Sequence, residues 1–286
     1  MVRVAITIGC AAAVVAACIL VVQLRNTRRT PSPLTALAPF GERLTVTVGR
    51  TGGMLVGAYL GGILAIGAGG RLMMRVMAAT SPDEVQGLRT DAEETIGDVT
   101  VGGSMFLILV LGIGAGMAGL GIFATLRRWL PDRSLVAGLI GVAIGAGLLV
   151  RPSGLIASDN ADFTLLDPVA LAVALCVAMI LLFGATVGVL VDYLAPRWPQ
   201  PGRSPRGIAS LLPFAVLVLS PPLLIAAALG VFFGTVAPTL HPSARSNASP
   251  SASDGTSSRL ARGAVASAGV LGGASVLVAA AQVLML

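Results

Sequence analysis

Seven separate stretches of this 286-residue chain are apolar enough to cross a bilayer, and few ionisable side chains interrupt them. A membrane-spanning helix needs about 20 mostly apolar residues. No water is available in that layer, so the backbone must satisfy its hydrogen bonds within each segment, which favours helices. We therefore expect an all-α fold, a polytopic helical membrane bundle with about seven transmembrane helices. The spans are expected at 2–24, 52–77, 101–126, 134–150, 168–194, 208–236 and 263–286.

Composition limits what else the chain can contain. Hydrophobic residues make up 55% of it and charged residues 11%, whereas soluble domains are about 25% charged. Once the spans are assigned, residues 1–286 leave room for a single membrane domain. The stretch 237–262 is rich in Ser, Ala, Pro and Gly and cannot bury a core. We expect it to form a disordered outer loop, and we assign no role to its lone His241.

The charge pattern argues against nucleic acid as a partner. The net charge is +6, but the basic residues stand in small groups beside apolar segments and do not form one basic face. The expected partners are the lipid bilayer and other membrane proteins. All basic residues are Arg, which together with abundant Ala, Gly and Val indicates a GC-rich bacterial genome. We therefore expect a multi-pass protein of the bacterial cytoplasmic membrane.

Seven alternating helices divide the arginines between two sides. The larger group includes Arg25, Arg28, Arg29, Arg127 and Arg197. Cytoplasmic loops carry an excess of Lys and Arg, so this group is expected inside, with the N-terminus outside and the C-terminus inside. The first span could instead be a signal peptide, because Val15–Cys18 has the form of a lipoprotein cleavage site. The apolar run continues past Cys18 and is longer than a signal core, which favours an uncleaved helix.

Glycine recurs at four-residue spacing in six of the expected spans. Such a set forms a smooth strip along one helix face, and close backbone approach is the main source of helix packing in lipid. The sets are Gly53/57/61, Gly112/116, Gly141/145, Gly184/188, Gly230/234 and Gly269/273. They predict a tightly packed bundle. In the third span, the dense run 112–121 indicates very close neighbours or, alternatively, a locally unwound segment that lines a cavity.

One polar cluster stands out as a candidate site. Arg71 and Arg75 end the second span four residues apart, and Glu94 and Asp98 precede the third span at the same spacing. Residues four apart share a helix face, and charges near the membrane are costly when unpaired. One hypothesis is that the four residues pair and clamp the two helices together. The alternative is that the arginines extend to lipid headgroups and the acids belong to a solvated loop.

Other polar features carry less information. Pro221 and Pro222, near the middle of the sixth span, predict a kink that frees backbone carbonyls. Asp192, at the inner end of the fifth span, is expected to reach water or Arg197. We find no pattern that indicates catalytic, cofactor-binding or metal-binding residues, so no cofactor is expected.

Three classes of function remain open. The first is a non-enzymatic integral membrane protein, a subunit or scaffold, which fits the lack of acids inside the spans. The second is a transporter or channel for a small solute, supported by the glycine-dense third span and the predicted kink. Proton coupling is not expected because it uses acids or histidines inside spans. The third, an enzyme acting on lipid beside Arg71, has no nucleophile or metal motif to support it.

Overall fold

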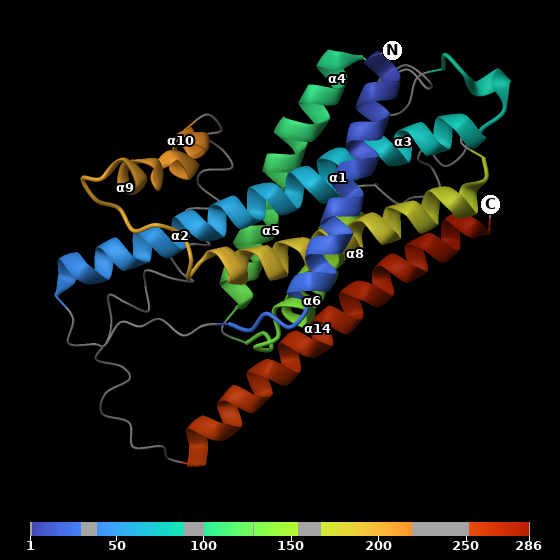
Figure 1. Ribbon diagram of the computed structural model, residues 1–286. Coiled ribbons are helices and arrows are strands. Elements are labelled where there is room, and N and C mark those ends of the chain that lie inside the picture. The colour runs from blue at the N-terminus through green and yellow to red at the C-terminus, as the bar shows by residue number, and fades with distance from the viewer. Residues whose placement is uncertain are drawn as a thin grey trace.

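The computed structural model describes residues 2–29, 39–88, 100–127, 129–153, 167–218 and 252–285, and within them every regular element is helical (Figure 1). Five helices are long and apolar enough to cross a membrane, and a shorter apolar one, Ser134–Leu148, lies within α6 (Ser134–Ser153). The expected all-α membrane bundle is therefore confirmed. The five are α1 (Val2–Leu24), Gly41–Thr80, Val101–Leu126, α8 (Val169–Leu194) and Arg262–Leu284 within α14 (Ala252–Leu284).

The second predicted span is part of a longer helix. Three segments, α2 (Phe40–Gly62), the π-helical η1 (Ile63–Ala68) and α3 (Gly69–Thr80), follow one another without a break. At about 1.5 Å per residue, 40 residues extend for about 60 Å, twice the thickness of the hydrocarbon layer. The first turns of α2, which carry Glu42 and Arg43, therefore have room to extend beyond the apolar layer.

The third span is likewise one continuous helix with a π-helical segment inside it. It consists of α4 (Val101–Met105), the π-helical η3 (Phe106–Leu111) and α5 (Gly112–Leu126). The two π-helical segments lie against each other: a Cβ atom added to Gly67 would stand 2.7 Å from the Ile108 Cα. Through the whole glycine-dense part, α5 is a regular helix. Of the two interpretations of the run 112–121, the one that predicted very close neighbours is confirmed, and the one that predicted a locally unwound segment is wrong.

Glycine strips bring the backbones of the central helices together. A Cβ atom added to Gly53 would lie 2.6 Å from the Leu194 carbonyl oxygen of α8. One added to Gly57 would lie 2.7 Å from the backbone nitrogen of Val191, also in α8. Gly116 lies against the Ala58 carbonyl of α2 in the same way. The apolar core between α2, α5 and α8 includes Leu55, Met117 and Leu120, each at most 1% exposed. The predicted packing by glycine is thus confirmed for these helices.

In α6 and α14 only some of the predicted glycines make close contacts with a neighbouring helix. A Cβ atom on Gly141 would meet only the Phe123 ring, at 3.9 Å, and one on Gly273 would meet nothing within 4 Å. The backbone contacts instead come from Gly138, which abuts the Gly184 carbonyl of α8, and from Gly272, which abuts the Ala143 carbonyl of α6. Of the predicted pairs, Gly145 and Gly269 do lie close to a neighbouring helix, because added Cβ atoms would stand 2.8 Å from Ile122 and 3.0 Å from Ile140. The four-residue spacing therefore identified one contacting glycine in each helix and missed Gly138 and Gly272.

The two ends of the chain lie at the same end of the bundle (Figure 1). In α14, Gly269 lies beside Ile140 of α6 and Gly272 beside Ala143, so the two helices run in the same direction. The last turns of α14 join a second apolar cluster with Met77 of α3 and Ala172 of α8. This arrangement differs from the predicted topology, in which seven alternating spans put the two chain ends at opposite ends of the bundle.

The difference concerns the part of the chain that contains the predicted sixth span, 208–236. The end of α8 and the beginning of α14 lie at the same end of the bundle (Figure 1), and residues 219–251 between them are outside the described residues. Before residue 219 this region forms two short helices, α9 (Pro205–Ala209) and α10 (Leu212–Val218). They are held near α2 and the end of α8, because Tyr59 donates a hydrogen bond to the Pro213 carbonyl and Trp198 donates one to the Ser210 carbonyl. Pro221, Pro222 and residues 237–251 of the predicted loop 237–262 lie outside the described residues. The rest of that loop, 252–262, is not disordered as predicted but belongs to α14.

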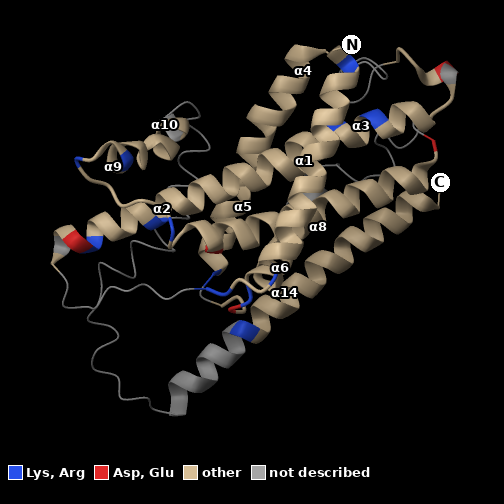
Figure 2. Cartoon of the chain, viewed as in Figure 1, with Lys and Arg blue, Asp and Glu red and all other residues tan. Residues whose placement is uncertain are grey.

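Charged residues gather at the two ends of the bundle (Figure 2). One end, called here the arginine-rich end, is where α1, α5 and α8 finish and α2, α6 and α14 begin. Because α14 starts there, Arg262 joins this end, although seven alternating spans assign it to the opposite side. Its described arginines are Arg25, Arg28, Arg29, Arg43, Arg50, Arg127, Arg133, Arg197, Arg203, Arg206 and Arg262.

Candidate functional site

The predicted cluster at the other end is described only in part. Arg71 lies in the first turn of α3 and is 6% exposed. Its Nε donates a hydrogen bond of 3.0 Å to the Ser104 Oγ, and the Ser104 hydroxyl donates one of 2.7 Å to the Thr100 carbonyl. Arg71 therefore does connect α3 to α4, but in the described part it does so through a serine hydroxyl.

The structure describes only one of the other three predicted members of that cluster. Arg75, one turn further along α3, is half-buried. Glu94 and Asp98 lie outside the described residues, so their pairing with the two arginines stays a prediction. The Arg71 side chain is buried against Ser104, whereas the alternative in which the arginines extend to headgroups and the acids form a solvated loop stays untested for Arg75 and the acids. Sequence reasoning missed Ser104, a small polar residue next to an apolar run.

A second polar cluster, at the arginine-rich end, was not predicted. The Arg127 guanidinium forms a two-point ion pair with Asp192, with Nη2 2.7 Å from Oδ2 and Nε 3.4 Å from Oδ1. The Ser134 hydroxyl donates a hydrogen bond of 2.6 Å to the same Oδ2. The Arg127 and Asp192 side chains are 8% and 10% exposed, and Ser134 is fully buried.

This cluster, called here the Arg127–Asp192–Ser134 cluster, joins three helix ends. Arg127 follows α5, Ser134 begins α6, and Asp192 lies in the last turn of α8. Arg127 also donates a 3.0 Å hydrogen bond to the Pro131 carbonyl and lies 5.2 Å from the centre of the Phe123 ring. Each charged group is thus compensated, as buried charges require. The arrangement holds helices together and leaves no carboxylate oxygen without a donor.

The expectation for Asp192 is corrected accordingly. Arg197, its predicted partner, instead stacks on Tyr193, with the guanidinium carbon 4.0 Å from the ring centre, and donates a 2.9 Å hydrogen bond to the Tyr193 carbonyl. Arg197 follows the end of α8 and is exposed. Arg127 reaches Asp192 from another helix because α5 and α8 end side by side.

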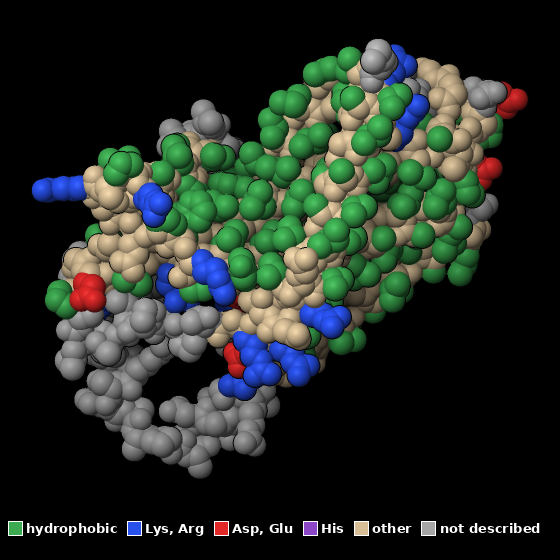
Figure 3. Space-filling view, viewed as in Figure 1, with side chains coloured by type: hydrophobic (Ala, Val, Ile, Leu, Met, Phe, Trp, Pro, Cys, Tyr) green, Lys and Arg blue, Asp and Glu red, His purple; other side chains and the backbone are tan. Residues whose placement is uncertain are grey.

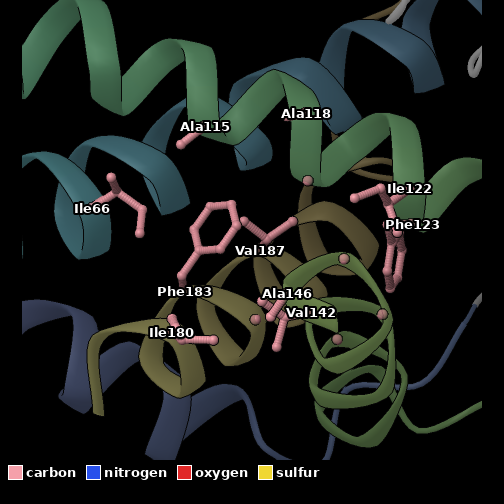
Figure 4. A pocket seen from close by; sticks show the side chains of 15 residues that line it. Ile66, Ala115, Ala118, Ile122, Phe123, Val142, Ala146, Ile180, Phe183 and Val187 are labelled. Carbon is pink, nitrogen blue, oxygen red and sulfur yellow. The ribbon is translucent and has the colours of Figure 1, made fainter. Parts of the chain in front are cut away.

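An apolar cavity lies between α5, α6 and α8. Its volume is about 250 Å³, and its lining combines small residues with the rings of Phe123 and Phe183 (Figure 4). The Phe183 ring projects from α8 toward α5 (Figure 4). The lining residues are Ile66, Ala115, Ala118, Gly119, Ile122, Phe123, Gly138, Gly141, Val142, Gly145, Ala146, Ile180, Phe183, Gly184 and Val187. None has a polar side chain, so the cavity can hold an apolar group. Apolar cavities of about 150 Å³ bind benzene, so this one is large enough for a small ligand.

The described residues contain no group of three His, Cys, Asp or Glu side chains that could hold a metal ion. No protein-family model, curated protein or solved structure matches this chain. Any inference about function therefore depends on the residues and contacts described above.

Proposed function

We propose that this chain is a non-enzymatic integral membrane protein, a subunit or scaffold whose partners are lipids and other membrane proteins. The observation that supports this most is the glycine-mediated contact of α2, α5, α6 and α8, in which backbone lies on backbone. Such contacts make a rigid frame, because packing in lipid depends on close approach. The polar groups described in this frame, Arg127, Asp192 and Arg71, bind to other parts of the same chain.

The outer helices offer the surface for partners. Within their membrane-spanning windows, 11% of α1 and 28% of α14 are buried. Val270 and Leu271 of α14 are 72% and 70% exposed, and Leu277 is 63% exposed. Large exposed apolar surfaces on a membrane protein face lipid or another membrane-spanning chain. These helices are therefore the proposed contact surface of the subunit.

The positive-inside rule supports an orientation for this frame. The arginine-rich end is proposed to face the cytoplasm of a bacterial cell, and the beginning of α1 and the end of α14 are proposed to face outward. This keeps the outer position expected for the N-terminus and places the C-terminal end beside it.

A photoreactive amino acid placed on α14 tests the subunit proposal. We expect a crosslinker at Leu271 or Leu277, in the chain produced at its native level in its own cells, to give one adduct of defined mass with another membrane protein. A crosslinker at the exposed Arg203, outside the membrane-spanning helices, is the control for non-specific capture. Adducts with lipid alone from both α14 positions contradict the proposal.

A second candidate, a carrier or channel for a small apolar solute without proton coupling, is favoured by the apolar cavity. It predicts that liposomes containing the protein are several-fold more permeable to such a solute than liposomes without it. Gly141→Leu, which places a side chain in the cavity, then abolishes the added permeability. The subunit proposal predicts equal permeability for liposomes with the native protein, the variant or no protein.

A further inference from the structure

Two arginines face each other across a short backbone pairing at the arginine-rich end. The segment after α1 meets the turn before α6 in an antiparallel bridge between Arg28 and Arg133. The backbone N–H of Arg29 donates a 3.0 Å hydrogen bond to the Asp132 carbonyl, and the backbone N–H of Ser134 donates one of 3.1 Å to the Thr27 carbonyl. The bonds therefore come from the neighbours of the paired residues, which is the geometry of a non-hydrogen-bonded pair.

That geometry makes two positively charged residues direct neighbours across the backbone pairing. In such pairs the Cα atoms are about 4.5 Å apart and the side chains leave the same face. Like charges directly opposite each other are destabilising. Arg28 and Arg133 are both exposed, and no ion pair of either is found among the described residues. The pair is therefore an arrangement that an anion between the two guanidinium groups would stabilise.

The neighbouring acids are not positioned to serve as that anion. Asp192 is already bound by Arg127 and Ser134. Asp132 is adjacent to Arg133, but no ion pair of Asp132 is found among the described residues. Further positive charge is close by. Arg29 donates a 3.4 Å side-chain hydrogen bond to the Arg127 carbonyl. The positive charge of Arg29 also repels that of Arg50. Figure 3 shows arginine side chains gathered at this end of the visible face.

One face of α1, the helix that precedes Arg28, is apolar and exposed. Val15, Ile19 and Val22 are 56%, 49% and 59% exposed, and their spacing of four and three residues puts them on one helix face. Arg25, the next residue at this spacing, is exposed just past the end of α1. A molecule with a hydrocarbon chain and an anionic end would meet apolar side chains along α1 and arginines at its end.

We propose that Arg28 and Arg133 form a phosphate-binding site that holds the headgroup of an anionic phospholipid, whose acyl chain lies along Val15, Ile19 and Val22. Guanidinium groups bind phosphate oxygens at two points with charge-assisted hydrogen bonds, and basic pockets at the cytoplasmic side are typical of lipid headgroup binding. The site does not depend on the proposed function, because either a subunit or a carrier could hold such a lipid.

Thermal unfolding of the full chain in a neutral detergent tests this site. We expect phosphatidylglycerol to raise the Tm by several degrees and phosphatidylcholine to raise it much less. In the double variant Arg28→Gln/Arg133→Gln, phosphatidylglycerol binds about tenfold more weakly. The matched control Arg203→Gln/Arg206→Gln removes two exposed arginines of the same end and keeps the native response.

Without lipid, the double variant has a Tm equal to or above that of the native chain, because it removes a repulsion. A merely structural pair would give a lower Tm, which would overturn the proposal. An unchanged lipid response in the double variant, or an equal loss in the control variant, also overturns it. If inorganic phosphate at millimolar concentration reproduces the effect of phosphatidylglycerol, the lipid is the wrong source of the phosphate.

Discussion

Replacing Asp192 with alanine is expected to lower the free energy of unfolding by about 3–5 kcal/mol, the usual cost of leaving one partner of a buried ion pair alone. Arg127 would keep its positive charge in a site where its side chain is 8% exposed. The Ser134 hydroxyl, which is fully buried, would lose its acceptor as well. The measurement is reversible unfolding in detergent micelles, followed by circular dichroism.

Two further variants separate the ion pair from a general effect of charge. Replacing both partners, as Arg127→Met with Asp192→Leu, is expected to recover most of the loss because no buried charge remains. The exposed Asp132→Ala should change the unfolding free energy by less than about 0.5 kcal/mol. A double variant as unstable as Asp192→Ala alone would show that the cluster does not hold the helices as described.

Gly138→Leu is expected to destabilise the protein strongly and Gly141→Leu is not, although the two residues lie about one turn apart on α6. A side chain at Gly138 would overlap the Gly184 carbonyl and approach the Gly188 Cα to 2.9 Å at its first atom. We expect a loss of about 3 kcal/mol or more, because backbone cannot move aside as a flexible side chain can. At Gly141 the only neighbour within 4 Å is the Phe123 ring, at 3.9 Å.

The side chain at position 141 would enter the apolar cavity between α5, α6 and α8. Filling it restores contacts that an empty volume lacks, and leucine is a better helix former than glycine by roughly 1 kcal/mol. Gly141→Leu should therefore leave the unfolding free energy unchanged or raise it by about 1 kcal/mol. Equal losses in the two variants would mean that α6 presents a different face to α8.

Hydropathy alone predicts the helices that lie wholly in the apolar layer. The bounds of α1 match the expected 2–24, and α8 begins one residue after its expected start. The second span was predicted too short because Glu42, Arg43 and Arg50 lower the hydropathy of the first turns of α2. Those residues nevertheless belong to one 40-residue helix, Gly41–Thr80, because charged residues can be helical and hydropathy measures only how apolar a segment is.

The candidate site was harder to predict because its contacts are remote in the sequence. Asp192 stands beside Arg197 in the chain, so local reasoning pairs these two, whereas Arg127 lies 65 residues away. The facing of Arg28 and Arg133 likewise depends on where α1 ends relative to α6. Glycine spacing predicted close packing, but selecting Gly138 over Gly141 requires knowledge of which helix lies opposite.

The arrangement of the two chain ends is the central claim that labelling can test. In a variant with Cys10, Cys18 and Cys176 replaced by alanine, single cysteines at Glu84, Met285 and Asp132 are treated with a membrane-impermeant maleimide on intact bacterial cells. Glu84 and Asp132 are exposed, and Met285 is 84% exposed. We expect Glu84→Cys and Met285→Cys to be labelled in intact cells, and Asp132→Cys only after permeabilisation. Labelling of Met285→Cys together with Asp132→Cys, and not with Glu84→Cys, would contradict the account.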